Sequence, residues 1–182
     1  KVVPEKLVAR SLGFGLGPRL NAAGRLETAQ WGLDLLTTND PQMAFELAER
    51  LDLMNQERRA EQDRIFKQAR AFVDAELQDD PVLVVSDPSW SHGIIGIVAA
   101  KLLEAYKKPA FVLQELPDGT AKGSARSFGD FSAVAAIRAT EIHLIKGGGH
   151  KLAAGVTLEA KNVPTWRDAM NEYYRSLQLV DQ

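Results

Sequence analysis

The clearest sign of chemistry in the sequence is a run of three glycines before a histidine, Gly147-Gly148-Gly149-His150. Consecutive glycines cost stability in helices and weaken strands, so we expect that the backbone either turns tightly here or lets another group approach it closely. Bare N–H groups in such a turn form an anion site, and the histidine and Lys151 add donors. Phosphate is the first ligand to consider, although a plain surface turn explains the run equally well.

A second candidate is the segment of small and polar residues at positions 120–127. Alternate residues of a strand point to the same face, so Lys122, Ser124 and Arg126 would project together. An ammonium, a hydroxyl and a guanidinium suit a phosphate group, because arginine binds two oxygens at once. The alternative is a solvated edge strand, which would gain nothing from the small residues on its back.

A third candidate follows the alternating glycines of residues 13–17. A dinucleotide-binding loop is disfavoured there, because no strand pattern precedes the glycines and Pro18 interrupts them. Arg19, Asn21 and Arg25 then stand among small residues, where they could grip a phosphate or carboxylate. A helix start capped by Asn21 is the alternative, and the residues alone favour it.

Several catalytic chemistries lack the residues they need. The chain has no cysteine and three histidines, none of them in a metal-binding spacing. Ser91 beside His92 lacks the context of a nucleophile elbow. The residue chemistry therefore predicts a protein that binds an anion and has no visible means of cutting one.

Charge is distributed unevenly along a chain whose formal net charge is -2. Residues 41–80 hold ten acidic side chains against six basic ones, whereas residues 119–155 hold five basic against two acidic. The glycine run thus lies in the most basic part, which is what a local anion site requires.

The first half of the chain reads as helical. A short helix over residues 4–12 should end at Gly13, and Asp40 followed by Pro41 is a strong helix start. Residues 42–80 lack glycine and proline and repeat apolar residues at helical spacing, which predicts one long helix; a break near Asn55 is the alternative.

The second half reads as an α/β domain. A buried strand, an apolar helix and another strand form a β-α-β unit that we expect to be parallel. A turn at 117–119 leads to the polar strand 120–127. The expected strands are 82–86, 110–114, 120–127 and 154–158, and the expected helices are 94–106, 131–139 and 163–179.

Bulk properties fit a cytoplasmic protein. No apolar run approaches the roughly 20 residues that span a bilayer, so we expect no membrane association. The first residues do not resemble a signal peptide, and the absent initiator methionine suggests a fragment or a processed chain.

Four motifs in this order resemble the RecJ family of single-stranded-DNA exonucleases, in the DHH/DHHA1 phosphoesterase superfamily. The resemblance covers essentially the whole chain, and four ordered motifs are far more specific than any one. They are Gly17-Pro18-Arg19-Leu20-Asn21-Ala22-Ala23-Gly24-Arg25, the stretch from Trp90 to Ile97, Gly123-Ser124-Ala125-Arg126-Ser127, and Gly148-Gly149-His150-Lys151-Leu152-Ala153-Ala154-Gly155.

The resemblance implies the C-terminal part of a 5′-to-3′ exonuclease involved in DNA repair and recombination. Residues 1–38 would be the helical tail of a DHH domain, 39–80 a long connecting helix, and 81–182 a DHHA1 domain with a mixed, partly parallel sheet flanked by helices. In the family the DHH domain carries the ligands for two divalent metals, manganese or magnesium. Since that domain is otherwise absent here, we expect no metal in this fragment and no hydrolysis by it alone.

The resemblance also implies roles for particular residues. Ser124 and Arg126 match positions that grip the 5′-terminal phosphate, and His150 matches the histidine that faces the catalytic centre. His92 is displaced by one position from the family pattern, so we carry over no role to it and expect a structural role in the turn. The positions expected to bind single-stranded DNA are Arg19, Asn21, Arg25, Lys122, Ser124, Arg126, Ser127, Gly148 and Gly149.

Two alternatives remain at this point. One is a related phosphoesterase acting on short oligonucleotides or cyclic dinucleotides, because those relatives share the glycine-histidine motif. The other is a non-catalytic module whose long helix binds a protein partner; any DNA-repair partner is unidentified.

Overall fold

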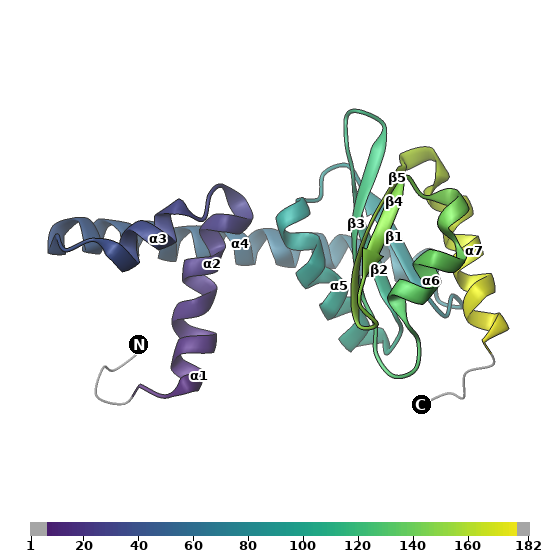
Figure 1. Ribbon diagram of the computed structural model, residues 1–182, viewed down its shortest axis with the longest axis horizontal. Coiled ribbons are helices and arrows are strands. Elements are labelled where there is room, and N and C mark those ends of the chain that lie inside the picture. The colour runs from purple at the N-terminus through teal and green to yellow at the C-terminus, as the bar shows by residue number, and fades with distance from the viewer. Residues whose placement is uncertain (1–6, 178–182) are drawn as a thin grey trace. The chain divides into compact units, whose positions relative to one another are not determined.

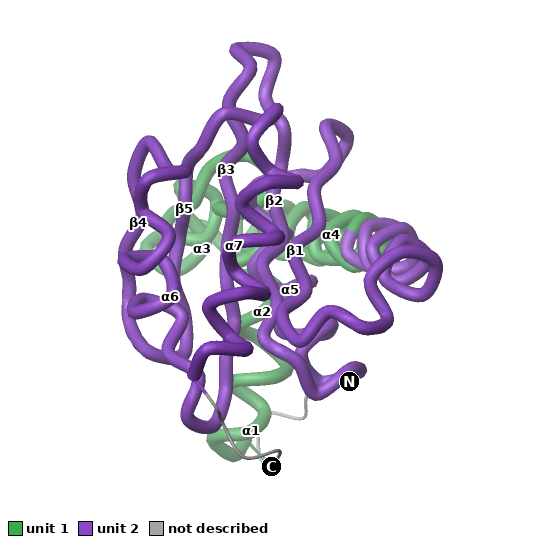
Figure 2. Tube along the Cα trace, turned by 90° about the vertical axis from the view of Figure 1, so that its right-hand side faces the viewer, with its two compact units in different colours: residues 1–61 green, residues 62–182 purple. Residues whose placement is uncertain are grey.

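A computed structural model describes residues 7–177 of the chain. The chain divides into two compact units, residues 1–61 and residues 62–182, drawn in different colours in Figure 2. Within the described residues, no helix is both long enough and apolar enough to cross a membrane.

The start of the described chain is helical without interruption from residue 9 to residue 26. Helix α1 (Ala9–Ser11) passes through a π-helical segment (Leu12–Leu16) into α2 (Gly17–Leu26). The expected helix end at Gly13 is therefore wrong. Glycine at position 17 suits the π-helical segment, because a Cβ there would lie 3.2 Å from the carbonyl oxygen of Leu12. Asn21 lies inside α2 and does not cap it.

Helix α3 (Gln30–Thr37) packs closely on α2. A Cβ on Gly32 would lie 3.2 Å from the carbonyl oxygen of Leu20, so any larger residue would push the two backbones slightly apart. The small core of this unit consists of Ala22, Ala23, Leu51 and Met54, with Leu20, Leu26, Trp31 and Leu35 packed against it.

Helix α4 (Pro41–Glu76) is a single helix of 36 residues, so the alternative of a break near Asn55 is wrong. Its start matches the prediction: the Asp40 carboxylate accepts a hydrogen bond of 2.9 Å from the backbone N–H of Gln42. This bond satisfies a donor that a helix N-terminus otherwise leaves free. The Asn55 side chain, 1% exposed, accepts a hydrogen bond from Arg58 within the helix.

The second unit contains a five-stranded mixed sheet in the order β1-β2-β3-β5-β4. β1 and β2 are parallel, as the β-α-β pattern predicted, and every other neighbouring pair is antiparallel. The strands are β1 (Leu83–Asp87), β2 (Ala110–Glu115), β3 (Thr120–Arg126), β4 (Lys146–Gly149) and β5 (Ala153–Glu159).

Helices cover both faces of this sheet, with α5 (His92–Tyr106) on one face and α6 (Ala133–Ala139) and α7 (Val163–Ser176) on the other (Figure 1). The α7 face holds a large apolar core, in which Phe111 and Trp166 meet edge to face with ring centroids 5.4 Å apart. The buried Trp166 Nε1 donates to Thr140 at 2.9 Å. The predicted fold class is confirmed, and residues 178 and 179 of the expected last helix lie outside the described residues.

The glycine run is an edge strand, so the tight turn is wrong, whereas the alternative of a close approach to the backbone is confirmed at Gly147 and Gly149. Gly147, Gly148 and Gly149 pair antiparallel with β5. The turn was expected because propensity disfavours glycine in strands, whereas here close neighbours require it at Gly147 and Gly149. A Cβ on Gly147 would lie 2.6 Å from Cγ2 of the buried Ile137 on α6.

Within the second unit, the last part of α4 is held to α5 by polar contacts. Lys101 forms a salt bridge of 2.8 Å with Asp63, and the Tyr106 hydroxyl donates to the Asp74 carboxylate at 2.6 Å. The Lys101 ammonium, through its hydrogen bond, lowers the pKa of Asp63. Burial, with the Asp74 hydrogen bond second, raises the pKa of Tyr106 from 10.0 to about 12.

A raised pKa stabilises the folded state below the unfolded value of 10.0 and loses that contribution as the pH rises toward about 12. We therefore expect Tyr106→Phe to flatten the fall in unfolding free energy above pH 10, measured by urea denaturation across a pH series. At neutral pH the lost hydrogen bond should cost about 0.5–1.5 kcal/mol. Parallel curves for both proteins through the alkaline range would contradict this role of Tyr106.

Candidate functional site

Three polar side chains on one face of β3 define the candidate site. The predicted alternation is confirmed: Lys122 is exposed, Ser124 and Arg126 are half-buried, and the intervening residues are buried. β3 lies between β2 and β5, so the alternative of a solvated edge strand is wrong. On the opposite, apolar face of β3, a Cβ on Gly123 would lie 2.6 Å from Leu113 Cγ. Close packing is therefore enough to explain why this position is a glycine.

Ser124 and Arg126 lie beside α5 at Gly96. A Cβ on Gly96 would be 3.4 Å from both Ser124 Oγ and an Arg126 terminal nitrogen, which brings the two polar groups to one place. Arg126 uses Nη1 to donate to the carbonyl of Ala125 at 2.7 Å. Among the described residues it forms no salt bridge, so guanidinium donors remain for an anion.

Strand register extends this polar face across β5 to β4. Lys122 is paired with Thr157, which is paired with Lys146; two residues along, Ser124 is paired with Gly155, which is paired with Gly148. A cavity of about 400 Å³ opens over these rows. It is lined by His92, Lys122, Gly123, Lys146, Gly147, Gly148, Gly155, Val156 and Thr157.

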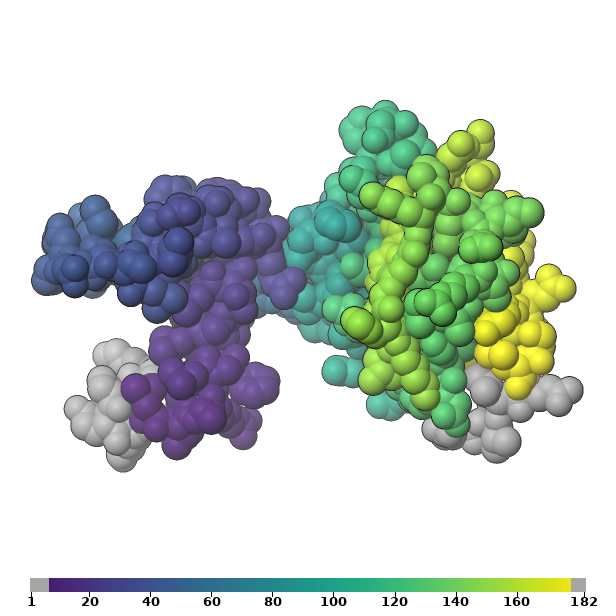
Figure 3. All heavy atoms as spheres, viewed as in Figure 1, coloured from purple at the N-terminus to yellow at the C-terminus, as the bar shows by residue number. Residues whose placement is uncertain are grey.

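The glycines of β4 differ in what they do. Gly149 has a φ of 146°, and a Cβ there would lie 2.5 Å from the Cα of Ala154, so its backbone admits glycine alone. A Cβ on Gly148 would meet nothing within 4 Å, and it would stand in the open space over the sheet. Figure 3 shows the β4–β5 hairpin on the molecular surface, where Gly148 is exposed.

The remaining predicted residues of this unit are used in different ways. His150 is exposed at the end of β4, and its backbone N–H donates to the carbonyl of Ala153 at 2.8 Å. Ser127 is buried, and its hydroxyl donates to the carbonyl of Phe131 at 2.6 Å. A hydroxyl used in this way holds the end of the strand and does not face the cavity.

Arg19, Asn21 and Arg25 belong to the first unit, on α2. Arg19 Nε lies 2.6 Å from the Asp52 carboxylate, and its Nη1 donates to the carbonyl of Gly15 at 2.7 Å. The Arg19 hydrogen bond lowers the pKa of Asp52. Asn21 and Arg25 are exposed, whereas Arg19 ties the π-helical segment to α4.

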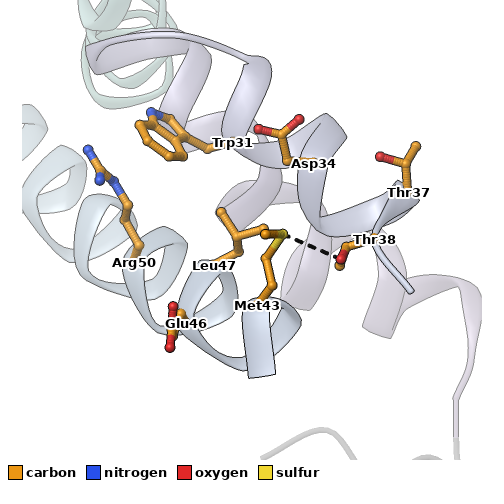
Figure 4. A pocket seen from close by; sticks show the side chains of 8 residues that line it. All are labelled: Trp31, Asp34, Thr37, Thr38, Met43, Glu46, Leu47 and Arg50. Atoms are coloured by element: carbon orange, nitrogen blue, oxygen red, sulfur yellow. Dashed lines mark hydrogen bonds between the residues drawn. The ribbon is translucent and has the colours of Figure 1, made fainter. Parts of the chain in front are cut away.

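The first unit also contains a cavity of about 470 Å³ between α3 and the start of α4, which sequence reasoning missed (Figure 4). The Arg50 guanidinium lies 3.7 Å from the centroid of the Trp31 ring. Acidic and basic groups are mixed in this lining, so it is a poor phosphate site. Its residues are Trp31, Asp34, Thr37, Thr38, Met43, Glu46, Leu47 and Arg50.

The donor set of the described residues does not fit a metal ion. Residues 7–177 contain no group of three or more histidine or acidic side chains that could hold one. The cavity over β3, β4 and β5 is lined by two lysines, which favour an anion.

Sequence reasoning missed three polar residues of the cavity: His92, Lys146 and Thr157. His92 was expected to act in a turn, and it is the exposed first residue of α5. Lys146 directly precedes the glycine run, and its place became clear only from its pairing with Thr157. The sequence did carry a signal for Thr157. Thr157 lies two residues beyond Gly155 in β5, so the two residues share one face of the strand.

The fold and this polar face are features of one family of protein domains. Residues 79–176 match the DHHA1 domain family, and the chain belongs to that family.

More particular relatives are the single-stranded-DNA-specific exonucleases named RecJ. The protein from Bacillus subtilis is 39% identical over 163 residues, which cover 89% of this chain and 21% of the relative. The resemblance inferred from the four motifs is confirmed: this chain is homologous to part of RecJ. It spans between a fifth and a third of the curated relatives it matches.

Solved structures give the same relationship. RecJ of Thermus thermophilus in complex with Mg²⁺ is 32% identical, with a TM-score of 0.82 over 91% of this chain and 26% of that one. The complex with Mn²⁺ is 32% identical, with a TM-score of 0.83 over 94% of this chain and 25% of that one.

The two neighbouring glycines of β4 should respond differently to an added methyl group. Gly147→Ala forces a Cβ against the buried Ile137 and should lower the unfolding free energy by about 1–3 kcal/mol. Gly148→Ala, the matched control, should be neutral or stabilise by about 0.4–1 kcal/mol, because it restricts the unfolded chain. Urea denaturation measures both; equal losses would disprove the assigned orientation of the strand.

Proposed function

We propose that this chain is the strand-holding part of a RecJ-like, single-stranded-DNA-specific 5′-to-3′ exonuclease that acts in DNA repair and recombination. One observation carries the proposal: Ser124 and Arg126 converge beside Gly96 on the polar face of a DHHA1 domain. The named activity of the relatives supplies the substrate, single-stranded DNA. The proposed setting is the cytoplasm.

Arg126 and Ser124 are assigned to the 5′-terminal phosphate. The guanidinium offers two parallel N–H donors to two phosphate oxygens, and the Ser124 hydroxyl offers a third. Both groups are half-buried, where a charge-assisted hydrogen bond is less screened than at the open surface. They position the end of the strand and neutralise its charge.

Hydrolysis itself is assigned to a part of the enzyme beyond these 182 residues. The RecJ structures were determined with Mg²⁺ or Mn²⁺, and the described residues here do not fit such an ion. The chain alone should therefore hold DNA without cutting it. His150, exposed at the end of β4, is proposed to face the metal-bearing domain.

The proposed organisation keeps three segments: residues 1–38 as the end of a DHH domain, 39–80 as the connector, and 81–182 as the DHHA1 domain. Asn21 and Arg25 are proposed to contact the strand from the first segment. Arg19 would not contact the strand directly, because its guanidinium already binds Asp52 and the carbonyl of Gly15. Its proposed role is to hold the surrounding segment in place.

Binding of labelled oligonucleotides to the 182-residue chain tests the role of Arg126. Arg126→Ala should weaken binding of a 5′-phosphorylated strand about tenfold, and binding of the 5′-hydroxyl strand much less, because the lost contact is to the terminal phosphate. Arg138→Ala removes an exposed arginine from α6, on the opposite face of the sheet, and should change neither affinity.

Equal losses on the two strands after Arg126→Ala would remove the assigned role. A dinucleotide serves as the competing ligand. If it binds as tightly as a longer single strand, the chain belongs to a phosphoesterase of short oligonucleotides instead.

A further inference from the structure

We infer, building on the proposed function, that Gln68 on α4 is a positioning residue for the 5′-terminal phosphate. Gln68 holds Trp90, which lies two positions before the start of α5. Helix α5 in turn packs at Gly96 against the polar pair of Ser124 and Arg126. The sequence motif that begins at Trp90, which has no role in the proposed function, thereby acquires one.

A single oxygen of Gln68 accepts two hydrogen bonds. Its Oε1 accepts from the indole Nε1 of Trp90 at 3.0 Å and from Nη1 of Arg64 at 2.9 Å. Trp90 is 3% exposed, and a buried indole N–H needs such an acceptor, because an unpaired one costs its lost hydration. Arg64 also donates through Nη2 to the carbonyl of Ser89 at 2.9 Å. One turn of α4 thus binds two consecutive residues that lead into α5.

The start of α5 has no side-chain cap of its own. Ser91 precedes the helix, and its hydroxyl makes no capping hydrogen bond. The backbone N–H groups of Ile94 and Ile95 both donate to the carbonyl of Ser91, at 3.0 and 3.1 Å. On the other side, the carboxylate of Asp87 at the end of β1 accepts from the backbone N–H of Ser89 at 2.7 Å. The place where α5 begins therefore depends on how the turn before it is held.

Directional contacts at this turn fix what apolar packing leaves adjustable. Hydrophobic burial holds α5 on the sheet but has no preferred direction, whereas hydrogen bonds require a defined geometry. A Cβ on Gly96 would lie 3.4 Å from Ser124 Oγ and from an Arg126 terminal nitrogen, so the polar pair lies directly against the helix backbone. The residues on either side of Gly96 are Ile95 and Ile97. A rotation or shift of the helix start would move one of these bulky side chains toward the space of the phosphate.

The other end of α5 offers a matched comparison. Tyr106, the last residue of α5, donates to the carboxylate of Asp74 on α4 at 2.6 Å. Loss of this bond also loosens α4 from α5, but about 15 Å along the helix from Gly96 at 1.5 Å per residue. Tyr106→Phe should therefore destabilise the domain without displacing Gly96.

The test measures preference for a 5′-phosphate in the 182-residue chain and three variants. Gln68→Leu keeps a side chain of similar size and removes the acceptor, and Gln68→Glu restores an acceptor oxygen at the same position. Tyr106→Phe is the control for general loosening. Fluorescence anisotropy gives the affinity of two oligothymidylates that carry a 3′ label and differ only in a 5′-phosphate or a 5′-hydroxyl. The readout is the ratio of the two affinities, because a change of net charge affects both strands alike.

Gln68→Leu should reduce this ratio about threefold to tenfold, because the phosphate contacts require exact placement. Gln68→Glu should retain the ratio of the unsubstituted chain. Tyr106→Phe should also retain it, although urea denaturation should show a lower unfolding free energy. An equal loss of preference in Tyr106→Phe and Gln68→Leu would overturn the specific role of Gln68.

Amide hydrogen exchange supplies a readout that does not require DNA. Gln68→Leu should speed exchange at the amides of Ile94 and Ile95, which bond to the carbonyl of Ser91 in the first turn of α5. Tyr106→Phe should leave both amides as protected as in the unsubstituted chain. Unchanged protection of both amides in Gln68→Leu would overturn the positioning role.

The outcomes separate the role of Gln68 from the proposed function. If the unsubstituted chain prefers the 5′-phosphorylated strand through Arg126 and Gln68→Leu keeps that preference, the role of Gln68 is overturned and the proposed function stands. If the unsubstituted chain binds the two strands equally, the phosphate site and the role of Gln68 are both overturned.

Discussion

The register of β3 against β5 is the constraint on which the site depends. Side chains alternate strictly along a strand, so a slip of one residue would move Lys122, Ser124 and Arg126 into the apolar core and their small neighbours outward. The core fixes the register, because Gly123 admits Leu113 and Val156 at distances that no side chain would allow. Packing on one face of the sheet thereby sets the geometry of the polar groups on the other.

Glycines in this domain allow neighbouring helices and strands to approach one another closely. Gly96 lets α5 descend onto Ser124 and Arg126, Gly147 makes room for Ile137, and Gly149 accepts a backbone conformation closed to side chains. Gly148 and Gly155 border space that the described protein leaves open. The same residue type thus serves packing at some positions and backbone conformation at others, and composition cannot separate the two causes.

Basic side chains gather at one place in a chain that is acidic overall. The formal net charge is -2, yet the cavity over β3, β4 and β5 is lined by Lys122 and Lys146 next to Arg126. The acidic residues of α4 are partly engaged in pairs such as Asp63 with Lys101 and Asp52 with Arg19. An anion at this cavity would meet a local positive field that the average charge conceals, because screening limits each charge to about 10 Å at moderate salt.

The sequence by itself determined the long helix after Asp40, the parallel β-α-β unit and the shared face of Lys122, Ser124 and Arg126, because capping and periodicity are local. It failed at Gly13 and at the glycine run of β4, where propensity predicted a helix end and a turn. Only the tertiary structure decided those, together with the positions of Lys146 and Thr157 at the cavity. Contacts between strands far apart in sequence override local propensity, and no local pattern records them.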